Sequence, residues 1–269
     1  MRNQEKAGTR KRRAAVHVLL TLALPAAILL LWEWGVRTGK LNGNVVPPPT
    51  KLWKTFISLA VSGKLGQGLL ISIRRVLEGF LIAAAAGIAV GFLMGLFAPV
   101  NRLLSSVVNI LRPIPVIAII PIFIMILGVG ESANIAIIII GALWPVLLNT
   151  VAGVRSVDRK LIEVAEVYGL GRGKIIFQII LPSALTSILT GLRLGIGGAW
   201  ASVVAAEMIG ATSGIGYMIM FAKSLAQAAN MYVLVLVIGL IGFFVDRILL
   251  AVQNRVRARF SGNGQKAGG

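Results

Sequence analysis

The sequence predicts an all-α membrane protein with about six transmembrane helices. Hydrophobic residues make up 57% of the 269 residues and charged residues only 13%, against about 25% in an average soluble domain. The mean hydropathy is +0.88. Several stretches of roughly 20 residues carry almost no charge, which is the length a helix needs to cross the hydrocarbon core of a bilayer. Lipid is therefore the expected solvent.

Apolar runs place the expected spans along the chain. They cover residues 14–36, 69–97, 104–127, 132–153, 183–207 and 231–250. The expected organisation is a basic tail at 1–13, a first span at 14–36, an external segment at 37–64, a transmembrane core at 65–252 with a polar loop at 154–182, and a second basic tail at 253–269.

The distribution of charge predicts the orientation. The chain carries 27 Lys and Arg against 9 Asp and Glu, and the basic residues lie between apolar runs instead of on one face of a soluble fold. This pattern excludes nucleic-acid binding. Lys and Arg collect in cytoplasmic loops, so both termini and the 154–182 loop are expected in the cytoplasm, in a bacterial inner membrane.

Several kinds of chemistry are excluded by residue type. There is no cysteine and the only histidine is His17, so neither a metal site built on these residues nor a Ser/His/Asp triad is expected. The apolar run after Arg10–Arg13 ends at Trp32–Trp34 without a small-x-small cleavage site, which favours an uncleaved first span.

The external segment contains an expected amphipathic helix. Pro47–Pro49 interrupts any preceding helix, and Thr50 is expected to cap a new one. Over 51–62, apolar residues recur at helical spacing opposite two lysines; these are Leu52, Phe56 and Leu59 against Lys51 and Lys54. The pattern fits a helix at the membrane surface, with an ordinary surface helix as the alternative.

Small residues recur at regular spacing in two expected spans, and prolines interrupt a third. The second span has small residues at intervals of four, at Ala83, Gly87, Gly91 and Gly95, and the fifth has a looser set at Gly191, Gly195 and Gly198. Such stripes let helix backbones approach closely. Pro113, Pro115 and Pro121 break the third span, and Arg112 lies just before the break. Arg112 either lines a translocation pathway or snorkels to a headgroup.

Two further charged residues have alternative interpretations, and one charged cluster has a single one. Arg193 in the fifth span either pairs with a carboxylate such as Glu78 or Asp246, or gives a solute pathway a positive lining. Glu207 belongs either to an outer gate or to a docking surface for a solute-binding protein. Arg74, Arg75 and Glu78 are expected to anchor the second span at headgroup level.

The 154–182 loop is the longest polar stretch between spans. Asp158 is expected to cap a short helix with Leu161, Ala165 and Tyr168 on one face, and Gly169 with Gly171 to end it. A second short helix, about 173–181, is expected to lead into Pro182. A helix-turn-helix with an uncovered apolar face suits docking on a soluble partner; a self-packed connector is the alternative.

The residues of this loop resemble a known motif. Glu163-Val164-Ala165, then Gly169, then Ile179-Ile180-Leu181-Pro182 is similar to the EAA loop of ABC importer permeases, with Val164 in place of the usual alanine. Segments around Arg112, Gly128–Glu131 and Glu207–Tyr217 resemble the branch that takes up sulfonates, taurine and nitrate. The resemblance implies the MetI-like transmembrane domain of type I ABC importers.

The resemblance also implies roles and partners. Glu163, Ala165 and Gly169 would sit in a cleft of a separate ABC ATPase subunit, and movement of the loop through Leu181 and Pro182 would tilt the fifth span. A solute-binding protein and a homodimer are implied as well. Gly171–Lys174 lacks the residues of a phosphate-binding loop, so this chain is expected to be no enzyme and to bind no cofactor, with ATP and magnesium held by the partner.

Two rival functions have their own signatures. An ion-coupled secondary transporter would carry inverted repeats and carboxylates at mid-membrane depth, and the sequence has no such repeat and few such carboxylates. A membrane scaffold would recruit a soluble partner through the same loop without coupling it to transport.

Overall fold

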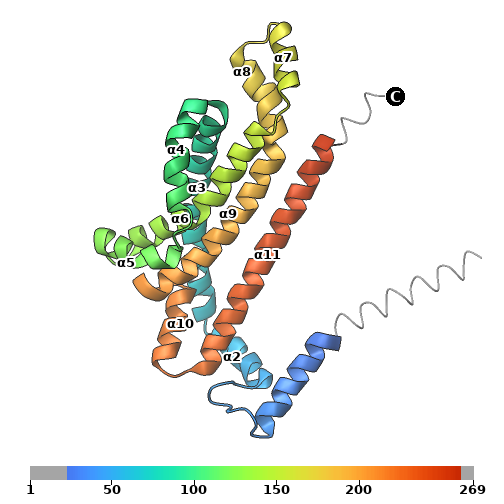
Figure 1. The fold of residues 1–269 in the computed structure, drawn as a ribbon. Helices are drawn as coiled ribbons and strands as arrows, with labels where there is room; N and C mark the ends of the chain where they lie inside the picture. The colour runs from blue at the N-terminus through green and yellow to red at the C-terminus, as the bar shows by residue number, and fades with distance from the viewer. Residues whose placement is uncertain (1–22, 262–269) are drawn as a thin grey trace, which may run out of the picture. The chain divides into compact units, whose positions relative to one another are not determined.

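The protein is helical throughout the part of the chain that the structure describes. The computed structural model describes residues 23–261, with side chains through Arg255, and contains no β-strand there. A first helix covers 23–37. The others are α2 Pro49–Val61, α3 Lys64–Leu96, α4 Ala98–Leu111, α5 Val116–Leu127, α6 Glu131–Arg155, α7 Arg159–Val167, α8 Arg172–Ile175, the π-helical turn η1 Ile176–Ile180, α9 Leu181–Gly210, α10 Ile215–Ser224 and α11 Ala228–Ser261 (Figure 1).

Among the described residues, four helices are long and apolar enough to cross a membrane, and they coincide with four expected spans. The regions expected at 69–97, 132–153, 183–207 and 231–250 fall on α3, α6, α9 and α11. In α9 the apolar helix is continuous with α8 and η1, from Arg172 to Gly210. The first expected span, 14–36, lies partly outside the described residues.

The third expected span, 104–127, is not one straight or gently kinked helix. It consists of α4 and α5, which meet at an angle of 98°. Pro113 and Pro115 lie between them, where each removes a backbone donor. With 12 residues, α5 is only about 18 Å long at 1.5 Å per residue, too short to cross alone. The break expected from the prolines is confirmed, and it is sharper than a kink.

The described helices fall into two compact units. An N-terminal unit joins the chain up to Gly63 with Ala222–Val233, and a main unit joins Lys64–Phe221 with the chain from Leu234 onward. Each unit has its own contacts. The main unit contains α3 to α9 and most of α11, and the N-terminal unit contains α2.

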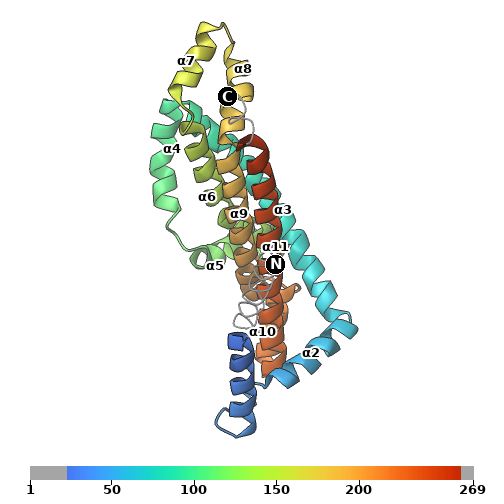
Figure 2. The ribbon, with the colours of Figure 1, turned by 90° about the vertical axis from the view of Figure 1, so that its right-hand side faces the viewer.

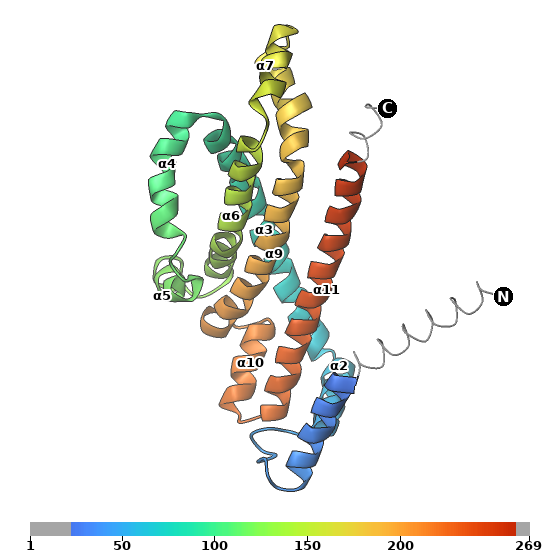
Figure 3. The same ribbon diagram turned by 45° about the vertical axis from the view of Figure 1, so that its right-hand side comes forward.

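The core of the main unit is α6, which packs against both α3 and α9 (Figures 2 and 3). The two glycine stripes expected from the sequence both face α6. A Cβ on Gly91 would come within 2.7 Å of Thr150 Cβ, and a Cβ on Gly191 within 2.8 Å of Asn149 Cβ. Gly198 of α9 lies directly against the backbone of Gly141. Helix backbones at these crossings are as close as glycine allows.

Candidate functional site

The 154–182 segment forms a compact elbow, defined here as α7, α8 and η1, at one end of α6 and α9 (Figure 1). The Asp158 carboxylate accepts a hydrogen bond from the Lys160 backbone N–H at 2.9 Å and so caps α7. Gly169 has a φ of +74°, a left-handed conformation that glycine adopts readily. The predicted cap of α7 and the predicted turn at Gly169 are confirmed, whereas Gly171 has a φ of −66° and is the N-cap of α8.

The elbow is joined to α9 without a break. The expected second helix, about 173–181, is instead α8 followed by the π-helical turn η1, which runs into α9 at Leu181. Pro182 is the second residue of α9 and lacks the N–H that an α-helical turn would use. A π turn tolerates that loss by widening the helix locally. Pro182 therefore does not separate elbow and span.

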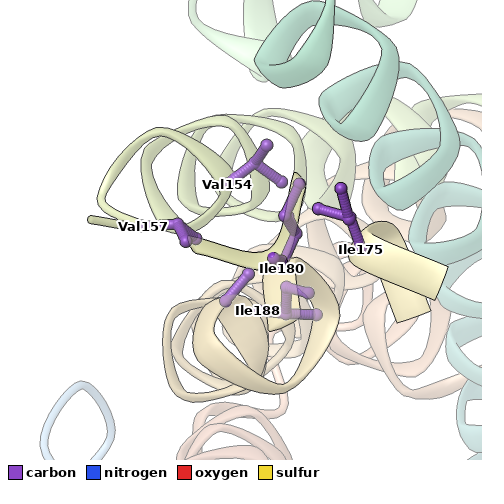
Figure 4. Packing of buried hydrophobic residues seen from close by; sticks show 7 residues of the cluster. Val154, Val157, Ile175, Ile180 and Ile188 are labelled. Atoms are coloured by element: carbon purple, nitrogen blue, oxygen red, sulfur yellow. The ribbon is translucent and has the colours of Figure 1, made fainter. Parts of the chain in front are cut away.

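A hydrophobic cluster fixes the elbow to the two long helices (Figure 4). Its buried residues come from the end of α6, the elbow and the start of α9: Val154, Val157, Ala165, Ile175, Ile180, Ala184 and Ile188. Ala165 is only 5% exposed and packs into this cluster. The cluster joins the elbow to α6 and α9 through close-packed side chains.

One face of the elbow is left uncovered. Val167 and Tyr168 are 87% and 80% exposed, and Leu161 and Val164 about half exposed. An open apolar notch on this face is lined by Leu161, Val164, Ala165, Tyr168, Leu170, Ile179 and Pro182. Glu163 is exposed beside it. Val164 faces open surroundings, so its extra methyl groups over alanine meet no steric obstacle in this chain.

A cluster of polar and charged side chains lies at the other end of α9. Its centre is Arg75 of α3, which is 2% exposed and uses all five N–H donors. The guanidinium contacts both oxygens of Glu131 at the start of α6, the Glu207 carboxylate at 2.8 Å, and the carbonyl and hydroxyl oxygens of Ser213. We call Ser72, Arg75, Glu131, Glu207 and Ser213 the polar knot.

Glu207 is the most deeply buried carboxylate of the polar knot, with 1% exposure. It accepts hydrogen bonds from the Ser72 hydroxyl at 2.8 Å and from the Gly216 backbone N–H at 2.9 Å. The Ser72 hydroxyl accepts one from the Ile215 N–H. Gly214 lies so close to the carboxylate that a Cβ there would overlap it. Because it is buried, Glu207 offers no docking surface in this conformation.

The other expected pathway residues lie apart from the polar knot. Arg193 forms a two-pronged pair with Asp246 of α11, at 2.7 and 2.9 Å. Arg112 is the C-cap residue of α4 and is exposed, together with Pro113 and Pro115, at the break before α5. Its side chain makes no hydrogen bond or ion pair within residues 23–255. The structure does not bring Arg112, Arg193 and Glu207 together in one site.

Sequence reasoning missed the role of Arg75. It placed Arg74, Arg75 and Glu78 together at headgroup level, whereas only Arg74 and Glu78 form an exposed pair. A signal was available: Arg75 lies four residues before Gly79 and eight before Ala83, on the same helix face as the glycine stripe. That face packs against α6, so Arg75 had to be buried and to have partners.

Fold and site together define a helical membrane protein with an uncovered apolar surface on the elbow. The family model of the binding-protein-dependent transport system inner membrane component matches residues 85–258. The chain belongs to this family, and so it is an ABC importer permease, a multi-pass inner-membrane protein distinct from the ATPase. Members work with an ATPase and a solute-binding protein, which sets aside the ion-coupled secondary transporter.

Relatives with named solutes cover most of the chain. SsuC of Bacillus subtilis, named for aliphatic sulfonate transport, is 37% identical over 87% of this chain and 85% of its own length. TauC of Escherichia coli, a taurine transport permease, is 34% identical over 89% of each chain. CmpB of Synechocystis, a bicarbonate transport permease, is 33% identical over 85% of each.

Solved structures support the fold alone. A chain of the inward-facing MetNI methionine ABC transporter has a TM-score of 0.57 at 19% identity, covering 68% of this chain and 94% of its own. A chain of an amino acid ABC transporter has a TM-score of 0.62 at 16% identity, covering 74% and 98%. The predicted all-helical fold of the type I importer class is confirmed.

Proposed function

We propose that this chain forms the translocation pathway for a small anion such as an aliphatic sulfonate, taurine or nitrate, and that its elbow docks on the ATPase subunit. The solutes in the names of SsuC, TauC and CmpB each carry a sulfonate or carbonate group. A solute that carries such a group fits these names.

The observation that carries the proposal is the state of the elbow. Its apolar side, with Val164, Val167 and Tyr168, is exposed, while its other side is locked into the cluster around Ala165 and Ile180. An exposed apolar helix face outside the bilayer is typical of a protein interaction site. Glu163, Gly169, Ile179, Leu181 and Pro182 lie in or next to this surface and are proposed to belong to the docking element.

The continuity of elbow and span supports the mechanism. When the paired ATPases close, the elbow is displaced, and η1 passes that displacement to α9 because no loop separates them. Tilting of α9 against α6 would switch access between the two sides of the membrane, as a rigid-body movement. The chain needs no ATP chemistry of its own for this step.

Arg112, Arg193 and Glu207 receive different proposed roles. Arg112, exposed beside Pro113 and Pro115, is the cation available to an anionic solute. Arg193 is proposed to be structural, because Asp246 already satisfies it. Glu207 is proposed to hold an outer gate closed through the polar knot.

The assembly proposed here has two copies of the chain, two ATPase subunits and an extracytoplasmic solute-binding protein. With both termini in the cytoplasm, the elbow faces the ATPases and the polar knot faces the binding protein. A two-fold pair would enclose one pathway between two permease copies.

The docking proposal predicts that a charge on the exposed apolar side of the elbow releases the ATPase. Val164→Asp should weaken ATPase binding roughly tenfold or more, because a carboxylate would be buried against an apolar partner. Gly173→Asp is the matched control: it adds the same carboxylate at an exposed elbow position with open space. Co-purification of the ATPase with each permease variant measures the effect.

Equal retention of the ATPase by both variants would contradict docking through α7. The solute part is tested separately in proteoliposomes that contain the complete complex. Uptake of taurine, an alkanesulfonate or nitrate with the cognate binding protein is expected, and uptake restricted to cationic solutes would contradict it.

A further inference from the structure

The N-terminal unit contains an apolar surface that the transport proposal does not use. In α2, Trp53, Ile57 and Val61 recur at intervals of four and so lie on one side of the helix. They are 64%, 45% and 83% exposed. We call these three residues the outer stripe of α2.

The outer stripe differs from the apolar face expected from the sequence. Leu52 is buried and Phe56 and Leu59 are partly buried, so that face is already covered. Trp53 stacks on Phe56 with ring centroids 5.7 Å apart. The helix therefore has one covered apolar face, one uncovered apolar face and a polar side with Lys51, Lys54 and Ser58.

The position and capping of α2 are fixed. Sequence reasoning assigned the cap to Thr50, but the helix begins at Pro49 and the capping group is the Glu33 carboxylate of the preceding helix. Glu33 accepts hydrogen bonds from the Thr50 backbone N–H at 3.2 Å and from its hydroxyl at 2.9 Å. At its other end α2 stops at Val61, and Gly63 follows the C-cap residue Ser62 with a φ of +74°.

We infer that the outer stripe of α2 lies in the bilayer interface, with Lys51 and Lys54 at the lipid phosphates of the leaflet that α3 enters. Amphipathic helices with Trp on the apolar side and Lys on the polar side bind this region. The sequence of α2 contains no acidic residue that would oppose anionic headgroups. Its charge is thus complementary to a lipid surface.

Two further observations point to lipid as the occupant. Trp32, Trp34 and Trp53, three of the five tryptophans, belong to the N-terminal unit, and tryptophan is enriched at membrane interfaces. In addition, α3 begins only three residues after Val61, and its exposed Leu70, Ile73 and Leu77 form a lipid-suited stripe. That stripe starts about 9 Å along α3.

The absence of cysteine from the chain makes a direct test clean. Single cysteines are placed at Trp53, Ile57 and Val61, with Lys51→Cys and Ser58→Cys as matched controls on the polar side of the same helix. Each full-length variant is spin-labelled in vesicles of phosphatidylethanolamine with a minority of phosphatidylglycerol. Collision rates with oxygen and with a water-soluble nickel chelate are then measured.

The outer stripe is expected to collide several-fold more with oxygen than with the nickel chelate, and the controls are expected to show the reverse. Access of the chelate to all five positions would overturn the inference, since α2 would then be a solvated helix. Low access of both reagents to the outer stripe would also overturn it, because protein would cover that face.

The role of the lysines has its own arm. Replacing phosphatidylglycerol by phosphatidylcholine should reduce oxygen access at Ile57→Cys. This reduction should be several-fold smaller in a Lys51→Gln/Lys54→Gln background than in the parent. An identical response of the two backgrounds to lipid charge would overturn the assignment of the lysines. Transport activity enters neither arm, so the result is independent of the proposed function.

Discussion

The two ends of α9 differ in whether their charged and apolar groups are exposed or buried. At the elbow, Val167 and Tyr168 are exposed and Glu163 has no partner within the described chain. At the polar knot, Arg75 and Glu207 are buried and every Arg75 donor is used. About 39 Å of helix separates Leu181 from Glu207. The polar knot satisfies its charged groups within the chain, whereas the elbow leaves an apolar side uncovered.

This difference assigns different physical tasks to the two ends. The polar knot joins α3, the start of α6 and the α9–α10 connection, so its removal should weaken the fold. The elbow contributes an apolar cluster to the fold on one side only. Changes on its other side should therefore leave stability intact and affect coupling to the partner.

The largest effect on stability is expected from Arg75→Ala. The substitution leaves Glu207 buried without its cation, which costs about 3–5 kcal/mol in comparable buried pairs. Arg74→Ala is the matched control, because Arg74 is the next residue and its pair with Glu78 is largely exposed. Thermal unfolding in detergent should show a large decrease for Arg75→Ala and no measurable decrease for Arg74→Ala. Equal decreases would mean that the polar knot contributes no special stability.

A smaller effect is expected from Glu207→Gln. The amide keeps the volume and one acceptor, but its NH2 group would face the donors of Ser72 and Gly216. A buried mismatch of this kind costs about 1–3 kcal/mol, while Arg75 keeps its pairing with Glu131. The unfolding midpoint should fall between those of the parent and Arg75→Ala. An unchanged midpoint together with unchanged transport would remove Glu207 from both the knot and the proposed gate.

Much of the fold was predictable because membrane helices and turns are encoded locally. Four apolar runs predicted α3, α6, α9 and α11, and Asp158 with Gly169 predicted the limits of α7. Apolar length and the preferences of capping residues act within a few positions of sequence. These elements need no information from distant parts of the chain.

The polar knot was not predictable in the same way. Arg74 and Arg75 have almost the same local sequence, yet the partners of Arg75 are 56 and 132 residues away. The 98° turn between α4 and α5 is similar: prolines predict a break, but tertiary packing sets its angle. Long-range pairing, unlike a cap or a span, depends on which helix faces meet.

The central claim, that the elbow transmits movement as a rigid extension of α9, is tested most directly at Gly169. A Cβ would meet open space at both Gly169 and Gly171, but only Gly169 has a positive φ, +74°. Valine is strained in that conformation and not at Gly171. In reconstituted complexes, solute uptake per ATP hydrolysed should therefore drop sharply for Gly169→Val and stay at the parental value for Gly171→Val. Parental coupling in a properly assembled Gly169→Val complex would contradict the account.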